Sequence, residues 1–321
     1  MLDLRSAYEG KTVLVTGAAG FIPSHLVDHL VDLGADVRAL DDLSEGRVEN
    51  LAASASRIRF QERSFVDPRG LDEIVSGCDY VFHLGANASV PRSAEDPAYD
   101  FDTNVVGTRN VIEAVRRTGA GPLVFTSSAA VYGEPIQAPM PETHPLFPKS
   151  PYGGTKLAAE FLLESYSRCY GFDHRRVRLF NTYGPRQSKY VMYDLLEKLR
   201  RDPTRLEMLG TGEQVRDYNY VSDSVTAILL IGCHPDARGN VYNVSGNNPI
   251  SIKELAVVLI EVLGIDPPEI SYTGESWPGD VQRMLGEITR IAALGFEAKV
   301  DLRTGLRHLV DWHREVYSPP W

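Results

Sequence analysis

Short apolar runs alternate with longer amphipathic stretches through the first half of the chain. Residues 11–16 form one such run, which is short, β-branched and followed by glycine, as is typical of a strand buried on both faces of a parallel sheet. Further runs of this kind lie at 36–40, 58–60, 80–84, 123–126 and 176–179. Stretches with helical spacing lie between them, among them 24–33, 104–118 and 152–170. The alternation predicts an α/β fold with a doubly wound parallel sheet and right-handed crossovers.

A glycine-containing turn follows the first predicted strand. Gly17 permits a tight turn, and Gly20 allows the backbone to approach a pyrophosphate. The helix that begins there offers free N–H groups and the positive end of its dipole to the same group. The second predicted strand ends at Asp41 and Asp42, where a carboxylate can accept hydrogen bonds from an adenosine ribose and repel a 2′-phosphate. The sequence therefore predicts a dinucleotide site that takes NAD rather than NADP.

Residues 150–156 begin a predicted helix and carry a candidate catalytic pair. Ser150 can cap the helix, and Pro151 suits its first turn. Tyr152 and Lys156 are four residues apart, so they share one helix face. A neighbouring ammonium lowers the pKa of a phenol, and a positively charged nicotinamide acts in the same direction. Tyr152 is thus a candidate base for a hydroxyl proton lost as hydride leaves the same carbon.

Composition and charge exclude some classes of binding partner and indicate the cellular compartment. The formal net charge of −10 at pH 7 argues against a nucleic-acid or anionic-membrane partner, although a local basic pocket for phosphate remains compatible with it. The three cysteines are scattered without the spacing of a metal site, and their odd, sparse count fits a reducing compartment. The polar start of the chain and the lack of a long apolar run predict a cytoplasmic protein without a membrane span.

Five further segments carry recognisable motifs. They read HLGANASV at 83–90, NVVGT at 104–108, TSSAAVYG at 126–133, LFNTYGPRQ at 179–187 and GEQVRDYNYVSD at 212–223. With the glycine turn and the Tyr/Lys pair, these segments resemble the extended short-chain dehydrogenase/reductase family, in its nucleotide-sugar epimerase/dehydratase branch. The resemblance covers residues 11–316 and is greatest to UDP-hexose 4-epimerases.

This resemblance implies a domain organisation and an assembly. It places a Rossmann-type NAD-binding domain at 1–180, to which segments near 215–260 return. A smaller, interleaved C-terminal α/β domain at 181–321 would bind most of a nucleotide-sugar substrate. The family commonly dimerises through the helices that correspond to 104–118 and 152–170, so we expect a homodimer. Neither nucleic acid nor a membrane is an expected partner.

The resemblance also assigns roles to individual residues. Tyr152 would be the base, Lys156 would bind the nicotinamide ribose, and Ser128 would hydrogen-bond the reacting sugar hydroxyl. The residues implied to contact the coenzyme are Gly17, Gly20, Phe21, Ile22, Asp41, Asp42, Ser44, Gly46, Ser64, Phe65, Leu84, Gly85, Ala86, Asn104, Tyr152 and Lys156. Those implied to contact the substrate are Ser89, Ser128, Asn181, Arg186, Arg216 and Arg283. No metal site is expected.

Two positions depart from the family pattern. Pro23 replaces the third glycine of GxxGxxG, and we expect a slightly displaced helix with coenzyme binding retained, because proline is tolerated in a first helical turn. Trp277 stands where an arginine often precedes the PGD motif and holds the substrate diphosphate. Arg216, with Arg283, is then expected to carry more of that role.

The residues after Ser128 separate the possible chemistries. Family members share oxidation at the sugar C4 by NAD, after which 4,6-dehydratases use an Asp-Glu pair, and glucuronate decarboxylases a Glu, directly after the catalytic hydroxyl. Here those positions are Ala129 and Ala130, whose methyl groups cannot transfer protons. The sequence therefore favours C4 epimerisation, with UDP-glucose/UDP-galactose as the commonest pair.

Several alternatives stay open at this point. The sugar could be an N-acetylhexosamine or a glucuronate, with Arg186 as a candidate partner for the glucuronate carboxylate, and the nucleotide could be dTDP, CDP or GDP. A dehydratase or decarboxylase could draw its acid and base from elsewhere in the chain. A non-catalytic NAD-binding regulator is a further reading, but such proteins usually lack the Tyr or Lys that this chain retains at 152 and 156.

Overall fold

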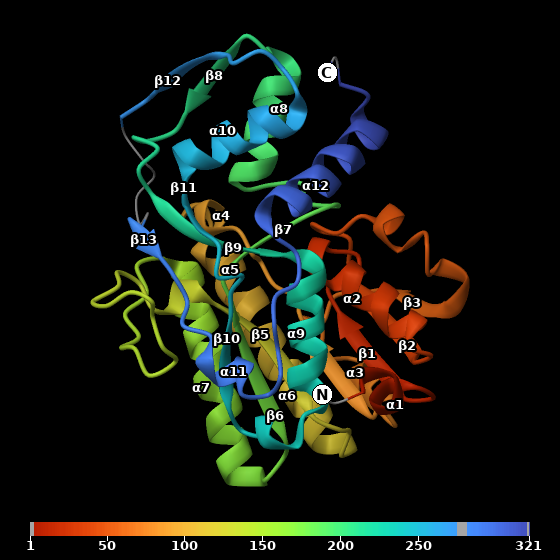
Figure 1. Cartoon of the computed structure of the whole chain (residues 1–321). Coiled ribbons are helices and arrows are strands. Elements are labelled where there is room, and N and C mark those ends of the chain that lie inside the picture. The colour runs from red at the N-terminus through yellow and green to blue at the C-terminus, as the bar shows by residue number, and fades with distance from the viewer. Residues whose placement is uncertain (1–2, 275–280, 320) are drawn as a thin grey trace.

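A seven-stranded parallel sheet forms the centre of the protein, as the sequence predicts (Figure 1). The computed structural model describes residues 3–274, 281–319 and 321. The strand order is β10-β6-β5-β4-β1-β2-β3. The strands are β1 (Thr12–Thr16), β2 (Asp36–Asp41), β3 (Ile58–Glu62), β4 (Tyr80–His83), β5 (Leu123–Ser128), β6 (His174–Leu179) and β10 (Val241–Val244).

Helices cover both faces of this sheet. The α-helices of the described residues, whether or not they cover this sheet, are α1 (Leu4–Tyr8), α2 (Phe21–Asp32), α3 (Leu71–Val75), α4 (Val90–Glu95), α5 (Pro97–Phe101), α6 (Thr108–Thr118), α7 (Pro151–Tyr170), α8 (Val191–Arg201), α9 (Val221–Cys233), α10 (Ile252–Leu263), α11 (Thr289–Ala292) and α12 (Leu302–Tyr317). In β1, Val13 and Val15 pack in the core that contains α2 and α9, whereas Leu14 packs in the core with α3, α6 and α7. This alternation follows from the two-residue period of a strand, and burial of both faces explains the continuous apolar run.

The strand order reverses direction between β1 and β4. From β1 the chain proceeds through β2 to β3 at one edge, and then returns to β4 on the other side of β1. In an open α/β sheet, the loops at the carboxyl ends of strands diverge at such a point and leave a crevice for a ligand. The fold therefore places a binding crevice beside the glycine turn after β1.

The predicted helix 104–118 has two parts. Residues Asp102–Gly107 form a π-helix, and α6 continues from Thr108. The Thr108 hydroxyl donates to the Asn104 carbonyl at 2.6 Å, and the Asn104 side chain is buried among other polar groups. π-Helical turns are rare and frequent at functional sites. Sequence periodicity does not reveal this turn, because it adds one residue to a helical turn without changing the apolar face of α6.

The second half of the chain builds two small sheets above the central one and also returns to it (Figure 1). The first has the order β11-β9-β13 with β7 beside β9, and the second pairs β12 with β8. Their strands are β7 (Asn181–Tyr183), β8 (Arg205–Met208), β9 (Val215–Tyr220), β11 (Pro249–Ser251), β12 (Glu269–Tyr272) and β13 (Arg283–Met284). The returning elements include α9, which packs against β5 and β6, and β10, the edge strand of the central sheet, against which α11 packs. The division into domains 1–180 and 181–321 stays a prediction, and Trp277 with the motif at 278–280 lies outside the described residues.

Candidate active site

A cavity of about 410 Å³ lies at the carboxyl ends of the central strands and extends to β7, β9 and β13. Most of the predicted site residues line it, including all three that the resemblance makes catalytic. They are Gly17, Gly20, Phe21, Ile22, Asp41, Asp42, Ser44, Gly46, Phe65, Leu84, Gly85, Ala86, Ser128, Tyr152, Lys156, Asn181 and Arg216. The cavity thus joins the glycine turn to the candidate catalytic pair.

The turn between β1 and α2 requires glycine at its first position. Gly17 has φ +68°, and a Cβ there would lie 2.6 Å from the Gly85 Cα. Gly20 is the N-cap of α2 and makes no side-chain cap, which leaves the first N–H groups of the helix for a ligand. The helix starts at Phe21, three residues earlier than predicted, and accommodates Pro23 in its first turn. Glycine backbone and helix terminus together fit a pyrophosphate.

Asp41 links this turn to the end of β2. Its carboxylate accepts hydrogen bonds from the N–H groups of Ala19, at 3.0 Å, and Leu43, at 2.7 Å. Burial raises the pKa of this carboxyl, and the two N–H donors act in the opposite direction. A Cβ at Gly46 would lie 2.8 Å from an Asp41 oxygen, so the loop must pass the carboxylate as bare backbone. These features fit the ribose end of a dinucleotide coenzyme.

Tyr152 and Lys156 face the cavity from the first turns of α7. Ser150 caps the helix by accepting from the Gly153 N–H at 3.2 Å, as predicted, and Pro151 occupies its first position. The Lys156 ammonium donates to the Thr126 carbonyl at 3.0 Å and lies 4.9 Å from the centre of the Phe125 ring. Contacts to β5 therefore fix where the lysine side chain lies.

Burial has the largest influence on the pKa values of Tyr152 and Lys156 in the chain without a bound coenzyme. It raises the pKa of Tyr152 to about 12, with a hydrogen bond to Ser128 acting in the opposite direction, and lowers the pKa of Lys156 to about 8. The predicted lowering of the tyrosine pKa by the lysine is not found in the chain alone, because burial, with the Asp100 charge acting in the same direction, raises the pKa of Tyr152. A bound nicotinamide cation would favour the phenolate.

Two predicted substrate arginines lie away from the cavity lining. Arg186 pairs with Asp28 of α2 at 2.6 Å and adopts φ +68°, so it fastens the loop after β7 to α2 rather than facing a sugar carboxylate. Arg283 is exposed on β13, whereas its neighbour Met284 lines the cavity, because successive strand residues face opposite sides. Neither arginine therefore lines the cavity, and their predicted substrate contacts stay predictions.

Three further residues with predicted ligand contacts make hydrogen bonds within the protein. Ser89 caps α4 by accepting from the Arg92 N–H at 3.2 Å, and Ser64 accepts from the Val66 N–H at 3.3 Å. Asn104 is buried and bonds to the Asn87 backbone and to the side chain of Thr155. None of the three lines the cavity as the structure describes it.

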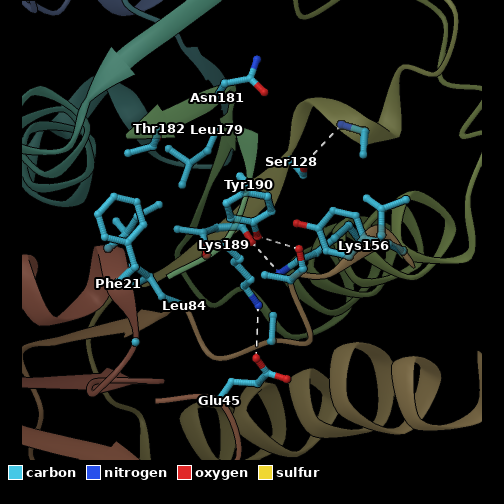
Figure 2. Close-up of a pocket in the computed structure, with 18 of the residues that line it drawn as sticks. Phe21, Glu45, Leu84, Ser128, Lys156, Leu179, Asn181, Thr182, Lys189 and Tyr190 are labelled. Carbon is cyan, nitrogen blue, oxygen red and sulfur yellow. Dashed lines mark hydrogen bonds and ion pairs between the residues drawn. The ribbon is translucent and has the colours of Figure 1, made fainter. Parts of the chain in front are cut away.

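Several residues that line the cavity escaped the sequence reasoning. The Tyr190 hydroxyl donates to the Ala88 carbonyl at 2.8 Å. The Lys189 ammonium lies 3.3 Å from a Glu45 oxygen, and Figure 2 shows this ion pair. Lys149 also lines the cavity and pairs with Glu134 at 2.9 Å. The position of Lys149 next to Ser150 was a usable signal. No sequence signal indicated Tyr190, because its hydrogen-bond partner Ala88 is distant in the sequence.

The described residues include no group of three or more His, Cys, Asp or Glu side chains suited to a metal ion. Within the same ranges, no helix combines the length and the apolar character needed to cross a bilayer.

Comparison with known proteins agrees with this geometry. Residues 13–245 match the NAD dependent epimerase/dehydratase family. The chain is 37% identical over 314 residues to a UDP-glucose 4-epimerase of Mycolicibacterium smegmatis, covering 94% of this chain and 98% of that one. It is 36% identical over 318 residues to a dTDP-glucose 4,6-dehydratase of Streptomyces griseus, covering 96% of each. A crystal structure of the Thermotoga maritima UDP-glucose 4-epimerase with UDP-glucose superposes with a TM-score of 0.88, at 36% identity, over 95% of this chain and 99% of that one.

Proposed function

The chain belongs to the NAD-dependent epimerase/dehydratase family, and from this premise we propose that it epimerises a UDP-hexose such as UDP-glucose or UDP-galactose at C4. One observation carries the proposal. Ser128 and Tyr152 line the cavity together, while the next two positions along from Ser128, Ala129 and Ala130, present only methyl groups to it. The site thus has a base for one hydroxyl and, at those two positions, no further proton-transfer group.

The chain's own residues would divide the work as follows. Gly17, Gly20 and Asp41 would hold NAD, which when bound supplies reversible hydride transfer at the sugar carbon. Tyr152 would take the proton from the C4 hydroxyl and later return it, and Ser128 would hydrogen-bond the same oxygen. The sugar would pass through a transient 4-keto form and receive hydride back on its other face. This sequence of steps requires no additional acid or base.

A product survey tests the proposal. The protein is incubated with UDP-glucose, UDP-galactose, their N-acetyl analogues, UDP-glucuronate and dTDP-glucose, and products are followed by NMR. We expect the C4 epimer of a UDP-hexose to accumulate to equilibrium without net consumption of added NAD. A deoxy-keto sugar or a pentose would contradict epimerisation and favour dehydration or decarboxylation. NAD binding with no product from any sugar would favour a regulator.

A dehydratase or decarboxylase is the second candidate. It is supported by the relative named as a dTDP-glucose 4,6-dehydratase and by two titratable side chains, Lys149 and Tyr190, in the cavity lining. Elimination of water needs an acid and a base near the sugar, and these residues could supply them. The same product survey separates this candidate from the first.

Arg216 and Arg283 form a matched pair for testing substrate binding. Arg216 lines the cavity, whereas Arg283 is exposed on the neighbouring strand. If Arg216 contacts a diphosphate, Arg216→Ala should raise KM by about tenfold to about a hundredfold, since a hydrogen bond to a charged group contributes roughly 1.5–3 kcal/mol. Arg283→Ala should leave KM unchanged. Equal effects of the two substitutions in steady-state kinetics would refute the contact.

The homodimer and the cytoplasmic location stay predictions. Phe161, which is 60% exposed, and Tyr170, which is 55% exposed, are the large apolar side chains that α7 leaves uncovered. They would be covered if α6 and α7 pair between subunits, as the family resemblance implies.

A further inference from the structure

Asp100 is a carboxylate with no exposed surface that is hydrogen-bonded to α7 at Thr155, between Tyr152 and Lys156 in the sequence. One of its oxygens accepts from the side-chain amides of Asn87, at 2.7 Å, and Asn104, at 3.0 Å. The other accepts from the Thr155 hydroxyl at 2.7 Å. All three donors are neutral, and no ion pair links Asp100 to a cation within the part of the chain that the structure describes. Three donors on two oxygens hold this carboxylate in place in the protein interior.

Lys156 carries the opposite charge in the same interior. Its side chain is 3% exposed, and the hydrogen bond to the Thr126 carbonyl is made to a neutral group. An ammonium in such a place tends to lose its proton unless a negative charge lies near it. Thr155, which binds Asp100, is the residue that immediately precedes Lys156 on α7.

The second acid near Lys156 already has a partner. Glu160, one turn further along α7, receives two hydrogen bonds from the Arg178 guanidinium, at 2.9 and 2.7 Å. This buried pair is neutral as a unit, so its field at Lys156 is weak compared with that of a single charge. Asp100 therefore supplies the uncompensated negative charge that faces the lysine.

We propose that Asp100 is a positioning residue that keeps Lys156 protonated in the buried active site, with Asn87, Asn104 and Thr155 holding its carboxylate in place. The inference rests on the proposed function only in that it concerns the same tyrosine and lysine. Asp100 acts through its field, because its oxygens are occupied by other donors. The arrangement leaves the ammonium free to contact Thr126 and a ligand rather than closing it into an ion pair.

Other titratable groups around the pair do not replace Asp100. Burial lowers the pKa of His83 on β4 to about 3, so this ring is neutral at physiological pH. Burial raises the pKa of Tyr190 well above its ordinary value, which keeps it neutral too. The Arg92 guanidinium on α4 is paired with Glu45 and lies over the Tyr99 ring. The pKa of Lys156 itself is raised by Asp100 more than by Glu160, against the effect of burial.

Titration of Lys156 by NMR tests the inference. Protein labelled with ¹³C at lysine Cε is followed against pH, and Lys156→Met assigns the signal. Asp100→Asn should move the midpoint of the Lys156 titration down by about one pH unit or more, a tenfold loss of the charged form per unit. Asp102→Asn is the matched control, because it removes the same charge from an exposed position two residues away and should leave the midpoint unchanged. Thr155→Ala keeps the charge and should shift the midpoint less than Asp100→Asn. Coinciding midpoints in the Asp100 and Asp102 variants would overturn the inference.

A stability cycle covers the case in which Asp100→Asn folds poorly. If Asp100 exists to balance Lys156, the double variant D100N/K156M should be more stable in urea unfolding than the sum of the two single changes. Additive losses, or a double variant that also fails to fold, would mark Asp100 as structural and overturn the proposal. These readouts do not require turnover. If the product survey finds no epimer but the Lys156 midpoint shifts in the Asp100 variant, the epimerase function is contradicted and this inference stands. If the survey finds the epimer but the midpoint does not shift, this inference is contradicted and the epimerase function stands.

Discussion

Tyr152→Phe is expected to lower turnover by about 10³-fold or more while leaving nucleotide-sugar binding largely intact. The substitution removes the oxygen that we propose as the acceptor of the substrate proton. The ring keeps its place, because Tyr152 is almost wholly buried at the start of a capped helix. Initial rates measured by NMR, and binding measured by calorimetry, check the two halves of this expectation.

The pH dependence sharpens the test. The base works as a phenolate, and burial raises the pKa of Tyr152, so the rate of the wild-type protein should increase with pH on the acid side. The Phe variant should lack this increase. Tyr166→Phe removes the same atom further along α7, outside the cavity lining, and should retain full activity. A Tyr152→Phe protein with more than about a tenth of wild-type turnover would exclude Tyr152 as the base, since loss of a general base costs about 10²- to 10⁴-fold.

Gly17→Ala is expected to destabilise the protein and to abolish NAD binding. A left-handed backbone costs an alanine about 1–2 kcal/mol. At φ +68°, the new Cβ would also lie 2.6 Å from the Gly85 Cα. The obstacle is backbone, so the clash must be relieved by moving the segment that follows β4 or the turn itself. We expect a total loss of about 2–4 kcal/mol, which is typical of strain added to a fixed backbone position.

Gly77→Ala is the matched control for this substitution. Gly77 has a similar φ of +73°, but a Cβ there meets nothing within 4 Å. It should cost about 1 kcal/mol, from conformation alone, and leave NAD binding intact. Urea unfolding and a fluorescence titration with NAD measure both effects. If Gly17→Ala bound NAD as well as Gly77→Ala does, the turn after β1 would not be the pyrophosphate site.

Local patterns in the sequence were sufficient for the frame of the protein. Three features depend on residues only a few positions apart: the buried strand β1, the turn at Gly17 and the capped helix start at Ser150. The local sequence is therefore sufficient to predict them. The four-residue spacing of Tyr152 and Lys156 likewise fixes their shared face once the helix is known. Alternation of strands and helices then leads to the doubly wound sheet, because crossover handedness leaves few other arrangements.

The tertiary structure decided which polar side chains remain for a ligand. Arg186 binds Asp28, which is 158 residues away in the sequence, and Tyr190 binds Ala88, which is 102 residues away. No local spacing in the sequence predicts either contact. Asn104 has the sequence context of a coenzyme residue, but its amide is used by Asp100 and Thr155 in the interior. A charged or polar side chain can bind a ligand only if other protein groups do not already occupy its hydrogen bonds. Which groups are close enough to do so depends on how segments distant in the sequence pack. The sequence by itself therefore determined the scaffold and the shared helix face of the candidate catalytic pair. Which polar side chains line the cavity depended on the folded chain, because long-range contacts satisfy polar groups that a local pattern leaves open.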